Sequence, residues 1–318
     1  MKKPKSLIQL LRIIHDEKSC RELVENIRWQ GNPICPHCHC QSEGEHYQHY
    51  KLKVGGKFNG LYKCRKCRKT FSVITKTMFA NTNIPLGKWL YAIFHFLSNK
   101  KGMSSVQLSK NMEITQKTAW FMLHRIRHNL GERIMIQFAD MTQIDETYVG
   151  GKTRFRYGKD KKIKEKKGTQ GRSLENKTPV MGLLCNGMVY TQVVHDTRAE
   201  ILKPIIYDLV KRGSLIITDG YSSYIGLDEY YIHKVVDHKR KIYVKDGYHI
   251  NSLEGFWGHL KRTIKSTYHF VLPKYLQNYC DEAAFRYNTR DMGEWERFTT
   301  FISTACRRLS YWELAHDI

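Results

Sequence analysis

His249-Ile250-Asn251-Ser252-Leu253-Glu254-Gly255-Phe256-Trp257-Gly258-His259-Leu260-Lys261-Arg262 has the spacing of an amphipathic helix. Its polar face carries residues that recur at the helical period: Asn251, Glu254, Gly258 and Lys261. The apolar remainder would pack on a core. One face of the helix thus carries an amide, a carboxylate, a glycine without a side chain and an ammonium group. This set predicts a site that holds a metal ion at one end and a phosphate at the other. The alternative is a surface helix with solvated charges.

Two apolar segments elsewhere also carry carboxylates. Residues 143–151 have the pattern of a short strand that contains Asp145, and residues 214–220 that of a buried strand ending at Asp219. A carboxylate in or just after a β-branched run is costly to bury unless it binds something. Asp145, Asp219 and Glu254 are therefore candidate ligands of a two-metal site for phosphoryl transfer.

In combination these motifs resemble the DDE transposases of bacterial insertion sequences, and most closely the ISXO-like family with an N-terminal zinc ribbon. The resemblance rests on Asp-Glu-Thr-Tyr-Val-Gly-Gly-Lys at 145–152 and on Asn-x-x-Glu-Gly-Phe-Trp-x-x-x-Lys-Arg at 251–262. It implies an α/β (α+β) chain with a ribonuclease H-like catalytic domain. It also implies binding of terminal inverted repeats, followed by metal-dependent strand cleavage and strand transfer.

The resemblance places Mg²⁺, or Mn²⁺, at Asp145, Asp219 and a third ligand. Glutamate is the third ligand in most DDE enzymes, which points to Glu254, whereas some relatives carry asparagine, which fits Asn251. The two residues lie one helical turn apart on one face, so both remain candidates. Glu146 points to the opposite face of its strand from Asp145 and is expected to have a supporting or structural role.

Two C-x-x-C motifs, Cys35-Pro36-His37-Cys38 and Cys64-Arg65-Lys66-Cys67, resemble the knuckles of a zinc ribbon. Cys35, Cys38, Cys64 and Cys67 would complete a tetrahedral structural site. Nearby His37 and Cys40 are not assigned as ligands. The ribbon strands are expected within 47–54 and 60–63. The basic residues around the second knuckle predict DNA phosphate contact or a merely solvated turn.

Helical spacing predicts helices over 86–99, 104–112 and 116–129, of which the last two resemble a helix-turn-helix. The polar residues at the start of the second helix would reach base edges: Thr115, Gln116, Lys117 and Thr118. Further down this helix, Arg125 is expected to contact DNA. Lys261, which would hold a phosphate as a point charge, and Arg262 are expected DNA contacts from the catalytic domain.

From residue 142 the pattern predicts strands over 142–149, 178–185 and 188–195, the last two joined by an Asn186-Gly187 turn. A helix over 199–211, strands over 215–218 and 231–236, a helix from 249 and a helix after Leu272-Pro273 to about Arg290 complete the expected fold. The segment 152–177 contains eleven Lys or Arg and is predicted to be a basic loop that contacts nucleic acid. The expected domains are 1–30 (N-terminal helical cap), 31–75 (zinc ribbon), 84–130 (helix-turn-helix), 140–290 (catalytic) and 291–318 (C-terminal helical tail).

The excess of positively charged residues indicates that the protein binds a polyanion. The 318 residues include 53 Lys and Arg against 30 Asp and Glu, a net charge of +23. No secretory signal or membrane span is recognised, and nine cysteines then indicate a reducing compartment. The expectation is a cytoplasmic, nucleoid-associated protein that binds double-stranded DNA at terminal repeats and at the target. Because two DNA ends must be brought together, the resemblance implies a homodimer or higher oligomer.

Two other functions remain open. A nuclease of the same fold needs the same carboxylates but does not join strands. A domesticated DNA-binding regulator would keep the zinc ribbon and the helix-turn-helix without catalysis. All three carboxylates are present, which favours the enzyme.

Overall fold

The computed structural model describes residues 3–41, 49–131, 137–150, 177–236 and 248–316. The chain forms two compact units, one from 1–132 together with 291–318 and one from 133–290. In the described part of the chain no helix is both long and apolar enough to cross a membrane. Apart from Lys177, the predicted basic loop at 152–177 lies outside the described residues.

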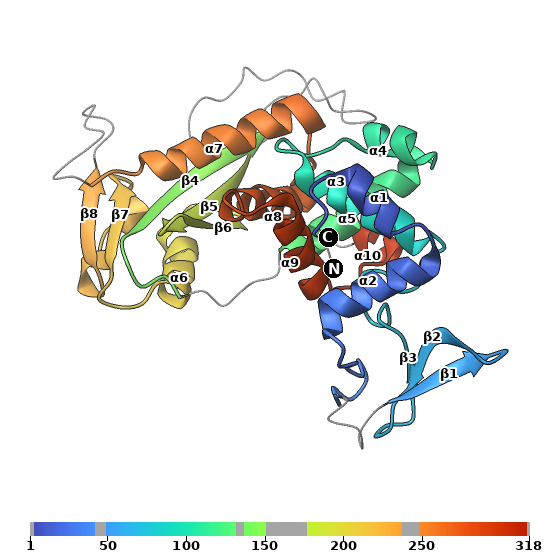
Figure 1. Cartoon of the computed structure of the whole chain (residues 1–318). Coiled ribbons are helices and arrows are strands. Elements are labelled where there is room, and N and C mark those ends of the chain that lie inside the picture. The colour runs from blue at the N-terminus through green and yellow to red at the C-terminus, as the bar shows by residue number, and fades with distance from the viewer. Residues whose placement is uncertain (1–2, 42–48, 132–136, 151–176, 237–247, 317–318) are drawn as a thin grey trace. The chain divides into compact units, whose positions relative to one another are not determined.

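The second unit is built on a five-stranded sheet with the order β6-β5-β4-β7-β8 (Figure 1). Strands β4, β5 and β6 are antiparallel neighbours, whereas β7 and β8 run parallel to β4. The strands are β4 (Thr142–Gly150), β5 (Lys177–Cys185), β6 (Met188–Val193), β7 (Leu215–Asp219) and β8 (Ile232–Val236). Its helices are α6 (Ala199–Leu209), α7 (Asn251–Thr263), which continues in a π-turn (Ile264–Tyr268), and α8 (Leu276–Asn288). This order and these directions confirm the predicted ribonuclease H-like fold.

The hairpin between β5 and β6 turns as the sequence predicts. Asn186 and Gly187 have φ values of 49° and 75°. A two-residue turn with φ above zero at both positions matches the right-handed twist of the strands, and Asn-Gly is the pair that tolerates it best. The turn sets the register in which Gly182 of β5 lies opposite Thr191 of β6. On its other side, Gly182 lies opposite Asp145 of β4.

Alternation along the strands gives the sheet two apolar faces. Ile144, Met181 and Leu183 pack with Leu202 and Ile206 of α6 in one cluster. The second cluster joins the other face to α7 and α8 through Val180, Leu184, Leu253, Trp257, Leu260 and Cys280. The sheet is therefore a layer between α6 on one side and α7 with α8 on the other.

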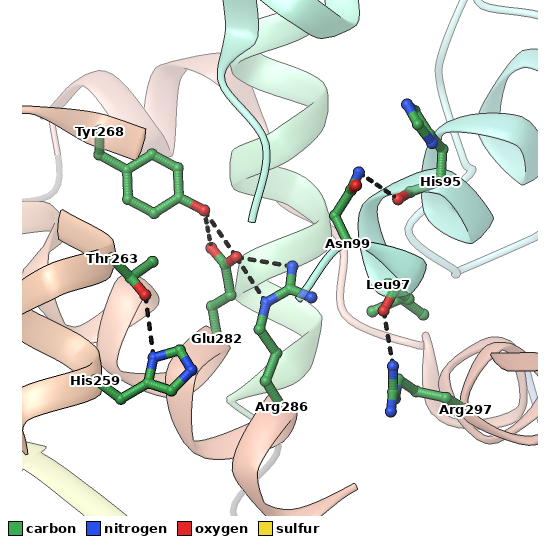
Figure 2. Close-up of polar contacts among 9 residues, drawn as sticks. All are labelled: His95, Leu97, Asn99, His259, Thr263, Tyr268, Glu282, Arg286 and Arg297. Atoms are coloured by element: carbon green, nitrogen blue, oxygen red, sulfur yellow. Dashed lines mark hydrogen bonds and ion pairs between the residues drawn. The ribbon is translucent and has the colours of Figure 1, made fainter. Parts of the chain in front are cut away.

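A buried polar cluster holds the end of α7 on α8. The Tyr268 hydroxyl donates to the two carboxylate oxygens of Glu282 at 2.8 and 2.9 Å (Figure 2). Arg286 reaches the same carboxylate with Nε at 3.1 Å and Nη2 at 2.9 Å. Because both charges of the pair are buried, removing either would leave the other uncompensated. The cluster fixes where α7 ends and thereby how its polar face lies along the sheet.

One edge of the sheet is closed by side-chain amides of α8. Asn288 accepts from the backbone N–H of Val189 at 2.7 Å and donates to the carbonyl of the same residue at 2.9 Å. Gln277 accepts from the N–H of Val193 at 2.7 Å and donates to the carbonyl of Thr191 at 3.0 Å. These bonds satisfy groups that an unpaired edge strand would offer to another chain.

The first unit contains a small ribbon and a helical bundle. The ribbon sheet has the order β1-β2-β3, with β1 (Tyr50–Val54), β2 (Lys57–Lys63) and a two-residue strand β3 (Thr70–Phe71) that the sequence pattern did not indicate. The helices are α1 (Leu7–Ile13), α2 (Glu17–Trp29), α3 (Leu86–Ser98), α4 (Ser105–Met112), α5 (Gln116–Leu130), α9 (Glu294–Thr304) and α10 (Tyr311–His316). Helices α4 and α5 match the predicted pair, capped by Ser104 and Thr115.

The C-terminal helices complete the bundle of the first unit. Helix α9 packs on α2, α3 and α5. Arg297 of α9 donates to the carbonyl of Leu97 in α3 at 3.0 Å (Figure 2). Arg28 of α2 donates to the carbonyl of Ile302 at 3.0 Å. Residues expected as a tail are thus a structural part of the unit that begins at the N-terminus.

Candidate active site and zinc site

Four thiols meet where the two C-x-x-C knuckles face each other. Sγ of Cys35 lies 3.7 Å from that of Cys67, and Sγ of Cys38 lies 3.6 Å from that of Cys64. All four sulfurs lie within 4.8 Å of one another. Tetrahedral zinc with Zn–S bonds of about 2.3 Å places its sulfurs about 3.8 Å apart. The predicted set therefore fits a structural zinc ion, with four protein ligands and no open position.

The two knuckles share one backbone geometry. In each, the N–H of the residue four positions after the first cysteine donates to that cysteine's carbonyl, from His39 to Cys35 at 2.8 Å and from Arg68 to Cys64 at 3.0 Å. Both donor residues have positive φ, 56° and 60°. A backbone N–H from Cys40 also lowers the pKa of the Cys38 thiol to about 7, which favours the thiolate that a metal requires.

His49 connects the knuckles and was not singled out from the sequence. It is buried, and its Nδ1 accepts from the N–H of Arg65 at 3.4 Å, which leaves Nε2 to donate to the carbonyl of Cys40 at 3.2 Å. His49, Cys40 and Cys64 also have donor atoms within 4.8 Å of one another. The bonds of His49 are to the backbone of both knuckles, so it braces the four-cysteine site.

The first carboxylate of the candidate active site lies on β4, facing α7. Gln143 and Asp145 share this face of the strand. The Gln143 side chain accepts from the N–H of Leu253 at 3.1 Å, and Asp145 accepts from Nε1 of Trp257 at 3.1 Å. Two successive side chains on this face of β4 thus fix the start and the middle of α7.

The register of the parallel strands brings the second carboxylate to the same level. Gln143 of β4 lies opposite Ile217 of β7, so Asp145 and Asp219, each two residues further on, occupy equivalent positions on neighbouring strands. Asp219 ends its strand, and its Oδ1 accepts from the N–H of Tyr221 at 3.0 Å.

The charge of Glu254, the third carboxylate, contributes to the pKa of Asp145, the first. Burial, followed by the negative charges of Asp219 and Glu254, raises the pKa of Asp145 to about 7, against the hydrogen bonds from the Glu146 backbone and Trp257. The three groups do not form a compact cluster. In the described residues, the groups whose donor atoms all lie within 4.8 Å of one another are the two cysteine-containing sets.

The polar face of α7 carries the remaining predicted residues. Asn251 begins the helix, and Asn251, Glu254 and Lys261 are exposed. Desolvation lowers the pKa of Lys261, as does the charge of Lys177, while the charge of Asp145 opposes the shift. Lys261 therefore lies within electrostatic range of Asp145. A methyl group on Gly258 would lie 3.3 Å from Nη1 of Arg262, so that guanidinium lies beside the glycine.

Glu146 lies on the other face of the sheet, as its position in the strand predicts. It is buried and accepts a hydrogen bond from the hydroxyl of Tyr224. Tyr224 is itself buried in the cluster between the sheet and α6, and burial, followed by the charge of Glu146, raises its pKa well above the ordinary value. Glu146 therefore has a structural role.

Gly182 leaves the space in which Trp257 reaches Asp145, and we expect Gly182→Ala to lower both stability and strand cleavage. A methyl group at Gly182 would lie 2.4 Å from Cζ2 of Trp257. Overpacking of this kind typically costs about 1–3 kcal/mol, and a small displacement of a positioned group can reduce a rate about a hundredfold. Urea unfolding and a single-turnover cleavage assay measure the two effects. Gly255→Ala is the matched control for stability, because nothing lies within 4 Å of its added methyl group. Unchanged stability and cleavage in Gly182→Ala would contradict this account.

The raised pKa of Asp145 predicts a pH dependence of stability in the metal-free chain. The unfolded state releases this proton near 3.8 and the folded state at about 7. The folded state therefore holds the extra proton between these values, and stability falls as the pH rises through this window. Asp145→Asn imitates the neutral form, so its stability relative to wild type should increase from about pH 4 to about pH 7 and then level off. Thermal unfolding of both chains in chelator across this range tests the prediction. A difference that does not change with pH would refute it.

The predicted base-reading residues surround the start of α5. Thr115 caps the helix by accepting from the N–H of Thr118 at 3.2 Å, and the two hydroxyls lie 2.8 Å apart. Gln116 donates to the hydroxyl of Ser105 at 3.4 Å. Thr115, Gln116 and Lys117 are exposed. These side chains present donors and acceptors at the helix end that enters the major groove in a helix-turn-helix.

The assignment of Arg125 to DNA contact is wrong. Its side chain is only 2% exposed. Nε donates to the carbonyl of Leu309 at 2.8 Å, Nη2 donates to that of Ala80 at 3.2 Å, and the guanidinium lies over the rings of Trp89 and Phe121. Arg125 is a buried brace between α5, α3 and the C-terminal segment.

Known proteins resemble both units. Residues 137–288 match the family model of the ISXO2-like transposase domain, and residues 15–70 match that of the transposase zinc-ribbon domain. A protein in transposable element ISH50 of Halobacterium salinarum is 26% identical over 244 residues, covering 75% of this chain and 80% of the relative. A transposase-like protein of Haemophilus influenzae is 30% identical over 105 residues, covering 33% of this chain and 84% of the relative.

Solved structures that match include a pre-cleavage Mos1 transpososome and a mariner Mos1 paired end complex with Mg. The first is 12% identical with a TM-score of 0.24 and covers 69% of this chain and 79% of that chain. The second is 11% identical with a TM-score of 0.27 and covers 71% and 77%. These scores are too low to support any statement about this chain.

Proposed function

Since the chain belongs to the ISXO2-like transposases and is a DDE-type DNA transposase, we propose that it binds the terminal inverted repeats of its own element and catalyses metal-dependent strand cleavage and strand transfer. The observation that carries the proposal is the half-buried Asp145 carboxyl, which lies beside Asp219 on the neighbouring strand and whose pKa is raised by burial and then by the charges of Asp219 and Glu254. Two half-buried aspartates and an exposed glutamate whose charges repel one another favour a site for divalent cations.

The metal ligands in this proposal are Asp145, Asp219 and Glu254, with Mg²⁺ or Mn²⁺ as the ion. The donor set fits, because hard divalent cations prefer carboxylate oxygens and keep positions open for phosphate oxygens. When bound, such ions activate the attacking hydroxyl and stabilise the leaving oxygen. Trp257 orients Asp145 through its 3.1 Å hydrogen bond, and Lys261 binds a phosphate on the same helix face.

DNA is held, in this proposal, mainly by the first unit. Thr115, Gln116, Lys117 and Thr118 read base edges from the start of α5, and the zinc ribbon presents its basic second knuckle to the phosphates. Arg262 and Lys261 add phosphate contacts beside the carboxylates. The excess of positive charge, +23, supports a polyanionic partner. A dimer or higher oligomer would allow two repeats to react in one complex.

Joining of strands separates this proposal from a nuclease of the same fold. The test uses a labelled duplex that carries the terminal repeat of the element, a supercoiled target plasmid, and either Mg²⁺ or chelator. Cleavage at the end of the repeat and insertion into the plasmid are expected with metal only. Asp219→Asn should lose both products while keeping DNA affinity, and Asp208→Asn, an exposed carboxylate on α6, should keep both products.

Each outcome selects one function. Metal-dependent cleavage without insertion favours the nuclease. Specific binding of the repeat without cleavage in Mg²⁺ or Mn²⁺ favours the regulator. Cleavage that persists in Asp219→Asn would show that this aspartate is not a metal ligand and would overturn the proposed site.

A further inference from the structure

The segment after α9 is fastened along the length of helix α5. Near the end of the helix, the Asn129 side chain donates to the carbonyl of Arg307 at 2.8 Å and accepts from its N–H at 2.9 Å. In the middle, Arg125 donates to the carbonyl of Leu309 at 2.8 Å. These buried or half-buried bonds fix residues 305–310 on the helix, so the following helix α10 has a defined place in the first unit.

Helix α10 lies beside the start of α5, where the base-reading residues are. The ring of Tyr311 packs edge-on against Phe121 with centroids 5.8 Å apart, and Nζ of Lys117 lies 4.9 Å from the centre of the Tyr311 ring. Trp312 follows directly and is 67% exposed, with its ring stacked on His316 at 5.1 Å. A large aromatic surface is thus held in the solvent next to the predicted groove-facing end of α5.

The charge around this aromatic surface is positive. Arg308 is exposed, and its charge lowers the pKa of Arg125 after the larger effect of desolvation. Glu313 is the acid of α10, and its carboxylate accepts from the N–H of Ser310 while Ser310 caps the helix through the N–H of Glu313 at 3.1 Å. The helix therefore carries an exposed tryptophan next to Tyr311, which contacts Lys117, with Arg308 exposed shortly before it and the nearby acid engaged in the helix cap. Cations and an exposed aromatic ring on one surface match the chemistry of contact with the phosphates and sugars of DNA.

We propose that Arg308 and Trp312 form a second DNA contact of the first unit, continuous with that of the helix-turn-helix. Trp312 would lie against the sugars or bases that flank the groove entered by α5, and Arg308 would neutralise a phosphate. Duplex DNA is the occupant, because the surface continues from Lys117 and carries the complementary charge. This inference rests on the proposed function, in which the same unit binds the terminal repeat.

The test measures affinity by fluorescence anisotropy with two duplexes, one that carries the terminal repeat of the element and one of scrambled sequence. Trp312→Ala is expected to weaken binding to the repeat by about fivefold or more, as truncation of an interface tryptophan typically does, and Trp312→Phe by less, because a ring remains. Arg308→Ala should reduce the slope of log affinity against log salt by about 0.9, the value for one phosphate. Ile8→Ala, which removes an apolar side chain that is 66% exposed on α1, is the control for Trp312. Lys18→Ala, on a side chain 75% exposed in α2, is the control for charge.

Hydroxyl-radical footprints separate a direct contact from a structural effect. Trp312→Ala should lose protection at the flank of the footprint only, whereas Lys117→Ala should lose protection in its centre. If Trp312→Ala and Arg308→Ala bind the repeat like wild type, with the same salt slope and the same footprint, the inference is overturned while the proposed function stands. A wild-type chain that binds neither duplex overturns both. Trp312→Phe and Arg308→Ala keep the test valid if Trp312→Ala fails to fold.

Discussion

Cys64→Ser is expected to abolish zinc binding and to unfold the ribbon at residues 31–75. Removing one thiolate breaks a set in which all four sulfurs lie within 4.8 Å of one another, and binding of structural zinc contributes about 10–16 kcal/mol in small zinc domains. Apart from the metal, the ribbon is held by Tyr62 and Phe71, which are buried against Trp29 of α2, so loss of the ion removes a large part of its folding free energy. Metal analysis of the purified chain, together with limited proteolysis across residues 31–75, measures the two effects. Chelation of the wild-type chain should reproduce the cleavage pattern of the variant.

Cys40→Ser is the matched control for this prediction. Cys40 lies in the same ribbon, and its sulfur belongs to the second group with His49 and Cys64, but it is not among the four ligands. Zinc content and protease resistance should therefore match those of wild type. Loss of zinc in Cys40→Ser, or its retention in Cys64→Ser, would show that the ion uses a different set of sulfurs.

Glu254→Gln is expected to reduce the rate of strand cleavage about a thousandfold, which corresponds to several kcal/mol of lost metal stabilisation. The charge of Glu254 contributes to the raised pKa of Asp145, which is consistent with its carboxylate serving the same ions. Asn251→Ala, one helical turn earlier, should reduce the rate by less than about tenfold, since a neutral amide contributes less to cation binding. A single-turnover assay in Mg²⁺ on the terminal-repeat duplex compares the two variants.

The reverse order of effects would make Asn251 the third ligand. DNA affinity, measured in chelator, should be the same in both variants, so that a fall in rate reports on chemistry and not on binding. Glu229→Gln removes an exposed carboxylate after β7 and should leave the rate unchanged. Stabilisation of the wild-type chain against heat by Mg²⁺ should be weaker in whichever variant has lost the ligand.

Much of the fold could be predicted because its signals are local. The Asn186-Gly187 turn, the apolar runs that end in Asp145 and Asp219, and the two C-x-x-C knuckles depend on neighbouring residues in the chain. The structure places β4, β7 and the start of α7 within about two residues of the expected positions. The pairing of Asp145 with Asp219 follows from strand order once the ribonuclease H-like fold is recognised.

The supporting residues could not be predicted because their roles depend on register between distant segments. Gly182 matters because it lies opposite Asp145 and beneath Trp257, and Gln143 matters because it accepts from a backbone N–H that is 110 residues away. His49 gave no signal, since its partners are backbone groups of both knuckles. Arg125 was misassigned because helical spacing cannot show that Leu309, 184 residues later, covers this side of the helix.

The return of residues 291–316 to the first unit has a consequence for synthesis on the ribosome. The buried or half-buried side chains of Arg28, Arg125 and Asn129 donate hydrogen bonds to carbonyls within residues 302–309. At about 5–20 residues per second, translation of the intervening second unit takes on the order of ten seconds. The catalytic unit can therefore fold on the nascent chain while the helix-turn-helix still lacks α9 and α10. A prematurely terminated chain would carry the carboxylates without a completed helical bundle in the first unit.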